Sequence, residues 1–420
     1  MNEINKKYDE KKLRLLIISA DKFPPFRVDV SILFGEEIVK KGHKIDWILQ
    51  SADNCSKSYV TKWKNCTVYV GKTDNGVSLF SKFRKYIYAM VHDFKIFSLM
   101  KQNRYDIIQV KDKFFAALLA IIASKIYKVP FVYWLSFPFP EARIYSFKVK
   151  TARYPYISLF MGLINKFLLY KIILPHANHI FVQSEQMKKD IARHGIPLDK
   201  MTSVPMGVSL KDIPYNVRSS KNKKIIKPSN EKWIVYLGTL NRTRRIDFLI
   251  RVLYKVLKKI PEARLILVGK GGNPEDEEFL KKEAKRLDIL KYIIFTGFLP
   301  MKEAWEYIRE ADVCVSPYYP IPILLSTSPT KLVEYMAMGK PVVANDHPEQ
   351  RLVIEQSGGG ICVPYDENAF AEAIIQLLND PEKAKEMGYR GRQYVEKYRC
   401  YSKISEIVEN KYFQILEMRS

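Results

Sequence analysis

Short apolar runs alternate with longer amphipathic stretches along most of the chain. In its first part, runs rich in β-branched and aromatic residues predict buried strands, and the stretches between them predict helices at 30–41 and 114–127. Strands that alternate with helices favour a parallel sheet covered on both faces. These first strands are predicted at 13–19, 44–49, 106–110, 130–134 and 179–183.

The same pattern starts again after a polar stretch. Residues 216–232 are rich in Ser, Lys, Asn and Pro and predict a linker. Beyond it, the chain predicts helices at 246–259 and 277–287 and a second set of strands. Two successive doubly wound halves indicate an α/β fold with a cleft between domains, where ligands commonly bind. The second set of strands is predicted at 233–237, 263–268, 292–295, 313–316 and 342–344.

One segment, 328–344, combines a loop, a short helix, a glycine stop and a strand. Pro329 suits a helix start, where its missing N–H costs nothing, and Gly339 suits the position after the last turn. A helix start that opens off a loop presents free N–H groups and a positive dipole end, which suits a phosphate. Glu334, about one turn further in, is placed to accept hydrogen bonds from sugar hydroxyls beside that phosphate. A surface glutamate on an ordinary helix is the alternative.

Glu334 is followed by Tyr-Met-Ala-Met-Gly-Lys-Pro-Val-Val, and this segment resembles the nucleotide-sugar signature of retaining GT-B glycosyltransferases of the GT4 family. Segments 203–208, 267–271 and 295–297 resemble further motifs of the family. The family's first glutamate would stand at Ser326, so that glutamate is missing from this chain. The resemblance covers residues 180–400 and implies the GT-B architecture, in which two Rossmann-like doubly wound domains face each other across a cleft.

The expected organisation follows from the linker and the resemblance. It consists of an acceptor-binding domain at 1–215, the linker at 216–232, a nucleotide-sugar-binding domain at 233–395, and a C-terminal helix at 396–420 that packs back on the first domain.

Transfer from a nucleotide sugar leaves a diphosphate, whose growing negative charge requires fixed cations and N–H donors. The basic turn 238–247 follows a strand and opens a helix, and it carries Thr239 and Arg244 where the family has arginine and lysine. Arg242 is placed to compensate for the missing arginine, and a solvated basic turn is the alternative. The resemblance thus implies Arg244, Arg242 and Glu334 as catalytic residues. The implied donor-binding residues are Gly238, Thr239, Lys331, Ser328, Thr330, Glu334, Gly269, Thr296, Gly297 and Phe298.

The acceptor side has fewer matching residues. Members of the family often carry a histidine after the fourth strand, and Ser136 stands at that position. The family's glycine pair in the first loop is replaced by a segment with Arg27 and Asp29. Both are candidates to contact the sugar or acceptor, or else to pair with the following helix. Glu141 is a further candidate on this side.

Positive charge is concentrated in the first half of the chain. The net charge is +24, with 40 Lys and Arg against 18 Asp and Glu in residues 1–230, but 29 against 27 in residues 231–420. Anionic lipid, a phosphorylated acceptor and nucleic acid are the candidate partners. Segments 81–100 and 154–174 favour lipid, because the first interleaves basic and aromatic residues and the second is strongly apolar. Lysines interrupt the second, which predicts an interfacial or core helix rather than a membrane span.

No metal or cofactor is expected. The five cysteines are scattered without a CxxC pair and the histidines show no ligand spacing, which suits reduced cytosolic thiols. The N-terminus lacks the apolar core of a signal peptide. No Asp-x-Asp triplet is present, which disfavours a metal-dependent GT-A enzyme.

The leading hypothesis is a cytoplasmic, membrane-associated retaining glycosyltransferase at the inner face of the membrane. It would move a sugar from a UDP- or GDP-sugar to a glycan or lipid-linked acceptor in cell-surface polysaccharide or glycolipid synthesis. A GT-B nucleotide-sugar 2-epimerase and a basic nucleic-acid-binding protein are the alternatives, although no nucleic-acid-binding motif is found. A Rossmann oxidoreductase is disfavoured, because no Gly-x-Gly-x-x-Gly follows the first strand.

Overall fold

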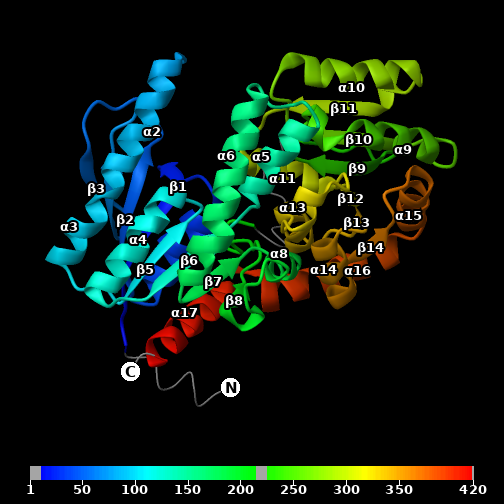
Figure 1. Ribbon diagram of the computed structural model, residues 1–420. Helices are drawn as coiled ribbons and strands as arrows, with labels where there is room; N and C mark the ends of the chain where they lie inside the picture. The colour runs from blue at the N-terminus through cyan, green and yellow to red at the C-terminus, as the bar shows by residue number, and fades with distance from the viewer. Residues whose placement is uncertain (1–10, 214–224, 419–420) are drawn as a thin grey trace. The chain divides into compact units, whose positions relative to one another are not determined.

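The computed structural model describes residues 11–213 and 225–418, so most of the predicted linker at 216–232 lies outside the described residues. The chain forms two compact units (Figure 1). Unit 1 comprises Met1–Pro205 and Tyr401–Ser420, and unit 2 comprises Met206–Cys400. The division falls before the expected limit at 215, because the backbone of Val208 bonds to that of Arg399 and joins unit 2.

Unit 1 is built on a sheet with the strand order β3-β4-β2-β1-β5-β6-β7-β8 in the described residues. Its strands are parallel except for β3, which pairs antiparallel with β4 at the edge. The five predicted strands are confirmed, whereas β3, β4 and β8 were not predicted. The strands are β1 (Arg14–Phe23), β2 (Lys44–Ser51), β3 (Tyr59–Trp63), β4 (Cys66–Gly71), β5 (Ile107–Lys111), β6 (Phe131–Leu135), β7 (His179–Val182) and β8 (Met201–Ser203).

Helices cover both faces of this sheet (Figure 1). One face packs against η1 and α17, and the other against α3, α4 and η2, in two separate apolar cores. The helices of unit 1 are η1 (Asp29–Ile38), α2 (Leu79–Asp93), α3 (Lys95–Gln102), α4 (Phe114–Tyr127), α5 (Phe139–Lys148), α6 (Pro155–Phe167), η2 (Leu168–Ile173), α7 (Leu174–His176), α8 (Glu185–Ala192), η3 (Leu198–Lys200) and α17 (Tyr401–Glu417).

The last helix, α17, belongs to unit 1 although the chain has passed through unit 2 before it. Its Tyr412 is buried against the sheet of unit 1. The Tyr412 hydroxyl donates to the side chain of Gln109, on β5, at 2.6 Å. Its Glu409 carboxylate accepts from Lys41 at 2.6 Å and from the His43 ring at 2.8 Å. Apolar burial and two polar anchors therefore hold α17 on this unit.

The segment predicted as an interfacial or core helix at 154–174 is partly buried in the core and partly exposed. Its second part, η2, buries Leu169, Tyr170 and Ile173 in the core of unit 1. Its first part, α6, packs against α5 but leaves a large apolar surface exposed. Pro155–His176 forms 22 helical residues, long and apolar enough to cross a membrane, and only 28% of its apolar stretch is buried.

Unit 2 is a fully parallel sheet with the order β11-β10-β9-β12-β13-β14 in the described residues. All five strands predicted for this half are confirmed, and the α/β architecture of two doubly wound sheets is therefore confirmed. The strands are β9 (Lys232–Leu237), β10 (Ala263–Val268), β11 (Ile293–Gly297), β12 (Val313–Ser316), β13 (Val342–Asn345) and β14 (Gly360–Val363).

The helices of unit 2 alternate with these strands and include α9 and α10, which were predicted at 246–259 and 277–287. They are η4 (Arg242–Arg244), α9 (Asp247–Leu257), α10 (Pro274–Arg286), η5 (Leu290–Tyr292), α11 (Met301–Glu310), α12 (Pro322–Leu325), α13 (Thr330–Ala337), α14 (Pro348–Ser357), α15 (Glu367–Asn379), α16 (Pro381–Tyr394) and η6 (Val395–Arg399).

The helix α13, predicted from the 328–344 segment, has well-defined ends. Pro329 is its N-cap rather than its first residue, and Gly339 follows the last turn with a φ of +69°. The N–H of Gly339 donates to Met336 O at 2.9 Å and that of Lys340 to Tyr335 O at 3.0 Å. This pair of bonds is a Schellman motif, which ends the helix and turns the chain directly into β13.

Candidate functional site

The carboxyl ends of β9, β10 and β11 bring three glycines together in unit 2. Gly238, Gly269 and Gly297 have φ values of +152°, +140° and +70°, which favour glycine. A Cβ on Gly269 would lie 2.0 Å from the carbonyl oxygen of Gly238, so the two turns touch without room for a side chain. This edge therefore exposes backbone rather than side chains, as a phosphate site requires.

Lys331, in the first turn of α13, faces this glycine edge. Its ammonium donates to the Tyr236 hydroxyl at 3.1 Å and lies 4.3 Å from the centre of that ring and 5.3 Å from that of Tyr318. A Cβ on Gly238 would lie 3.2 Å from the same ammonium. In the described residues Lys331 has no carboxylate within ion-pair distance. Its charge is thus held at the glycine turn without a fixed counter-ion.

Two residues of α13 that lie one turn apart, Lys331 and Glu334, have shifted pKa values. Burial, followed by the nearby Arg244 charge, lowers the pKa of Lys331 to about 7. Burial raises the pKa of Glu334 to about 7, although the Lys331 charge acts in the opposite direction. Both groups thus change charge near neutral pH. A bound anion or a bound hydroxyl would therefore easily change their protonation.

The three arginines of the basic turn 238–247 contact different neighbours. Arg244 lies 5.8 Å from the Tyr318 ring centre, in the same group as Lys331. Arg242 lies instead over the Phe279 ring of α10 at 5.2 Å. Arg245 stands at the family's glycine position and adopts a left-handed φ of +53°, with its side chain paired to Asp247. The structure therefore brings Arg244, but not Arg242, to Lys331.

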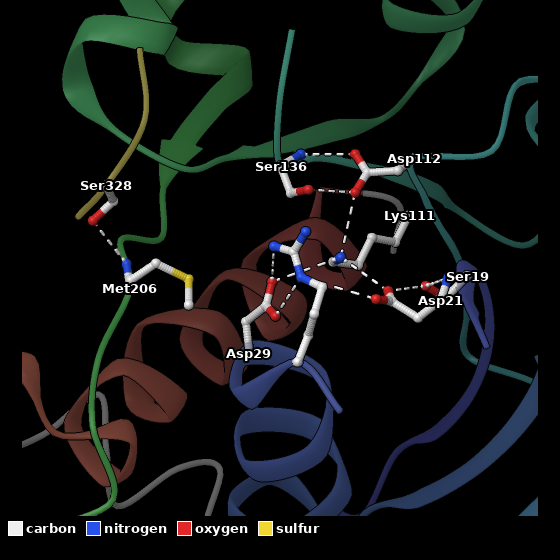
Figure 2. A network of polar contacts seen from close by, with 9 residues as sticks. Ser19, Asp21, Asp29, Lys111, Asp112, Ser136, Met206 and Ser328 are labelled. Carbon is white, nitrogen blue, oxygen red and sulfur yellow. Dashed lines mark hydrogen bonds and ion pairs between the residues drawn. The ribbon is translucent and has the colours of Figure 1, made fainter. Parts of the chain in front are cut away.

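The remaining predicted donor residues differ in burial and in hydrogen bonding. Ser328 is buried, and its hydroxyl accepts from the Met206 N–H at 3.0 Å (Figure 2). The carbonyl of Thr239 accepts from the Tyr236 hydroxyl at 3.3 Å, and the Thr296 hydroxyl donates to Gly297 O at 2.9 Å. Phe298 is 71% exposed just beyond β11. Thr330 opens α13, and Ser326, at the position of the absent glutamate, is buried after α12.

A second polar cluster lies in unit 1, at the carboxyl ends of β1, β5 and β6 (Figure 2). The Lys111 ammonium lies 3.0 Å from Asp21, 3.3 Å from Asp112 and 3.6 Å from Asp29. Arg27 donates to both carboxylate oxygens of Asp29, at 3.0 and 2.9 Å. Three carboxylates are thus held by two cations in a site where the Lys111 side chain is only 2% exposed.

The cluster shifts the pKa values of two of its carboxylates in opposite directions. Burial would raise the pKa of Asp29, but Lys111 and Arg27 outweigh it and lower the pKa. Burial raises the pKa of Asp112, against the lowering by Lys111 and by hydrogen bonds from Ser136. Asp112 also has a left-handed φ of +55°, the strained backbone common at functional sites.

The candidates predicted on the acceptor side fall into two groups. Arg27, Asp29 and Ser136 belong to the cluster around Lys111, and Ser136 donates its N–H to Asp112 at 2.8 Å and its hydroxyl to the same carboxylate. Glu141 has other neighbours: it lies beside Tyr170, where burial and then the Glu141 charge raise the pKa of the phenol.

Several residues of these groups were not predicted from the sequence. They are Tyr236 and Tyr318 in unit 2, and Asp21, Lys111 and Asp112 in unit 1. A signal was available for Lys111 and Asp112, because they follow a predicted buried strand at its carboxyl end. Within residues 11–213 and 225–418, no group of three or more His, Cys, Asp and Glu side chains is placed to hold a metal ion.

Comparison with known families decides the class of enzyme. A family model described as glycosyl transferases group 1 matches residues 217–394, and one described as Glycosyltransferase Family 4 matches residues 32–212. The chain belongs to the GT4-type glycosyltransferases. Its fold is therefore the GT-B fold, and the resemblance expected from the Glu334 segment is confirmed.

Individual relatives of this glycosyltransferase are distant. The alpha-monoglucosyldiacylglycerol synthase of Streptococcus pneumoniae is 24% identical over 292 residues, which are 68% of this chain and 61% of the relative. The matched segments span 51 to 61% of the lengths of this relative and of an uncharacterized glycosyltransferase of Haemophilus influenzae.

Solved structures share the fold over nearly the whole chain. Sucrose-phosphate synthase from Thermosynechococcus elongatus superposes with a TM-score of 0.72 at 20% identity, covering 97% of this chain and 100% of that one. Anabaena HepE, solved in complex with UDP and glucose, gives a TM-score of 0.65 at 15% identity, covering 95% and 99%. At such identities the likeness shows the fold alone.

Proposed function

We propose that this glycosyltransferase is a retaining enzyme that moves a sugar from a UDP- or GDP-sugar to a glycan or lipid-linked acceptor. The observation that carries the proposal is the position of Lys331, whose ammonium has no counter-ion in the described residues and faces the side-chain-free turns after β9 and β10. A nucleoside diphosphate is the ligand that such a site suits.

The residues of unit 2 divide the work of donor binding. The free N–H groups at the start of α13, with Lys331 and Arg244, would hold the diphosphate and neutralise the charge that it gains as the sugar leaves. Glu334, one turn further along α13, would accept hydrogen bonds from the ribose hydroxyls. Arg242 is further from this group and would contribute only through the field of the basic turn. In this scheme the cations supply the electrostatic stabilisation without a metal or cofactor.

The acceptor side belongs to unit 1 in this proposal. Arg27 is the most exposed of the charged residues around Lys111, at 27% of its side chain, and Asp29 fixes its guanidinium on one edge. Its remaining edge would meet the sugar or the acceptor, while Ser136 and Glu141 would line the same side. The relative named a monoglucosyldiacylglycerol synthase supports a lipid-linked acceptor.

The exposed surface of unit 1 supports membrane association. The helix α6 exposes Tyr156, Ile157, Phe160, Leu163 and Phe167, by 80, 62, 64, 53 and 59%. Basic residues precede it and interrupt it, as expected of a helix that lies in a membrane interface. We therefore place the enzyme at the cytoplasmic face of a membrane, in cell-surface polysaccharide or glycolipid synthesis.

The first test is nucleotide binding by thermal shift, with UDP, GDP, ADP and their sugar conjugates. A ligand of the folded state raises the stability by about 2.7 kcal/mol at a hundredfold excess over Kd. We expect a shift with one base that is lost in Glu334→Ala. No shift with any nucleotide, from protein shown to be folded, would remove the proposed donor site.

Two further assays separate the alternative functions. A 2-epimerase would convert the nucleotide sugar without an acceptor, so product analysis in an acceptor-free reaction identifies it. A nucleic-acid-binding protein would bind duplexes with a steep salt dependence and would ignore nucleotide sugars.

A further inference from the structure

A pocket of about 300 Å³ lies in unit 1, at the edge of the sheet formed by β3 and β4 and beside α2 and α3. Three tyrosines, Tyr59, Tyr69 and Tyr88, form much of its wall, and Lys72 and Lys95 stand among them. None of these residues takes part in the glycine edge of unit 2 or in the cluster around Lys111. The pocket therefore has no role in the proposed transfer chemistry.

The two lysines of this pocket have aromatic neighbours in place of counter-ions. The Lys72 ammonium lies 4.1 Å from the centre of the Tyr88 ring, and that of Lys95 lies 5.2 Å from the centre of the Tyr69 ring. In the described residues, neither has a carboxylate within ion-pair distance, whereas the nearby Lys113 and Arg84 pair with Asp93 and Asp74. Two cations without a counter-ion in one pocket favour an anionic ligand.

A neutral histidine, His92, also lines the pocket. Burial, with the charges of Lys113 and Lys95, lowers the pKa of His92 although a hydrogen bond to the backbone acts against this. Its Nε2 donates to the carbonyl of Tyr69 at 3.1 Å. The pocket thus presents two positive charges and several polar donors, and no carboxylate lines it.

An exposed apolar stripe runs along α2 at the margin of the pocket. Phe80, Phe83, Ile87, Val91 and Phe94 recur at helical spacing, with exposed fractions of 67, 64, 38, 62 and 53%. Val91 belongs both to this stripe and to the pocket wall. Because the other side of α2 packs on β2, β4 and α4, the stripe faces outward. Large exposed apolar surfaces of this kind mark interaction sites.

We propose that the α2 stripe lies in the surface of an anionic membrane and that the adjoining pocket binds the phosphate of a phospholipid headgroup through Lys72 and Lys95. The tyrosine rings and hydroxyls would contact the glycerol part of the headgroup. The stripe decides between occupants, because an acidic glycan would use the lysines and tyrosines but would leave five apolar side chains in water. The proposal rests on the proposed function, in which the acceptor is reached at a membrane.

The test is cosedimentation of the full chain with vesicles of phosphatidylcholine, alone or with phosphatidylglycerol added. We expect the double variant Lys72→Ala/Lys95→Ala to lose roughly 30-fold in partition to the anionic vesicles, from about 1 kcal/mol for each lysine. The control Lys101→Ala/Lys125→Ala removes the same charge from exposed positions on α3 and α4, and we expect a loss of only a few-fold. An equal loss of partition in both variants would overturn the proposal that the pocket binds the headgroup.

A soluble short-chain phosphatidylglycerol separates the pocket from the stripe. We expect calorimetry to show binding to the wild type and to Phe83→Ser/Phe94→Ser but not to Lys72→Ala/Lys95→Ala. Binding of an acidic oligosaccharide in place of the short-chain lipid would overturn the proposal in favour of a glycan site. Thermal shift with nucleotide, on the same proteins, reports the donor site independently, so a failure of the proposed function is distinguishable from a failure of the pocket.

Discussion

The ammonium of Lys331 lies 3.1 Å from the phenolic oxygen of Tyr236, above the turn at Gly238 where no side chain intervenes. Tyr236 comes from β9 and Lys331 from α13, so the contact joins two elements that are far apart in the chain. The tyrosine holds the cation in place without neutralising it. A cation fixed in this way is ready for a diphosphate, and its binding strength depends on its protonation.

Donor binding should therefore weaken as the pH rises above 7. The pKa of free Lys331 is lowered to about 7, and a bound diphosphate would raise it, so binding takes up a proton in this range. We expect the affinity for the nucleotide diphosphate to fall by up to about 10-fold per pH unit between pH 7 and 9. Calorimetry in buffers of different ionisation enthalpy would detect the proton uptake.

The matched variants for this measurement are Lys331→Arg and Lys331→Met. The arginine keeps its charge at every pH tested, so its affinity should be nearly independent of pH. The methionine should bind about 10- to 100-fold more weakly, since a charged hydrogen bond contributes about 1.5–3 kcal/mol. A pH slope that persists in Lys331→Arg would show that another group titrates.

The raised pKa of Glu334 predicts a pH-dependent effect on stability. Between the usual carboxyl pKa and about 7, the folded protein holds this proton more tightly than the unfolded chain, so the contribution of Glu334 to stability falls as the pH rises. Glu334→Gln removes the titration. We expect its stability relative to wild type, from urea unfolding, to increase between pH 5 and pH 7. The exposed control Glu372→Gln should show no such change.

Substitution of Gly269 should damage unit 2 and its donor site together. A Cβ there would lie 2.0 Å from a backbone oxygen, at a φ of +140° that other residues rarely adopt. We expect Gly269→Ala to lose about 3 kcal/mol of stability and the nucleotide-induced thermal shift. The neighbouring Gly272→Ala, whose Cβ meets only Asp276 at 3.8 Å, is the control and should keep both. Equal behaviour of the two variants would contradict the close approach of the turns.

Lys111 should be a major contributor to the stability of unit 1. Lys111→Met leaves the carboxylates of Asp21, Asp29 and Asp112 without their central cation, and breaking a buried pair in this way costs about 3–5 kcal/mol. Because the pKa of Asp29 is lowered, its share of the stability is present at neutral pH and is lost in acid. Denaturant unfolding should show this loss of stability. The control Lys40→Met removes an exposed ion pair and should lower the stability by less than about 1 kcal/mol.

The sequence predicted the elements of the fold well, because their signals are local. Every predicted strand and helix is present, and the buried runs 263–268 and 313–316 match β10 and β12 residue for residue. Of the strands that were missed, β3, β8 and β14 lie at the edges of the two sheets and β4 pairs with the edge strand β3. Partly exposed side chains blur the alternation in these strands.

The donor-binding roles stay predictions, but the structure shows which of the candidate residues lie together. Lys331 and Glu334 belong to one motif of fixed spacing, and Gly238 belongs to the basic turn 238–247. The structure brings Lys331 and Gly238 together at one edge. Arg242 and Arg244 stand two residues apart in one turn, and nothing in the sequence indicated that the first would lie on Phe279 and the second on Tyr318.

By itself, the sequence determined the alternation of strands and helices, the restart after the linker and the motif at Glu334, because periodicity, capping and spacing are properties of neighbouring residues. Only the tertiary structure decided that Asp21, Arg27, Asp29, Lys111, Asp112 and Ser136 form one buried cluster, and that Lys72 and Lys95 share a pocket. Those groups come from strands, helices and adjoining loops that meet only when the sheet is assembled. Their burial and charge are set by what packs around them, which no local pattern records.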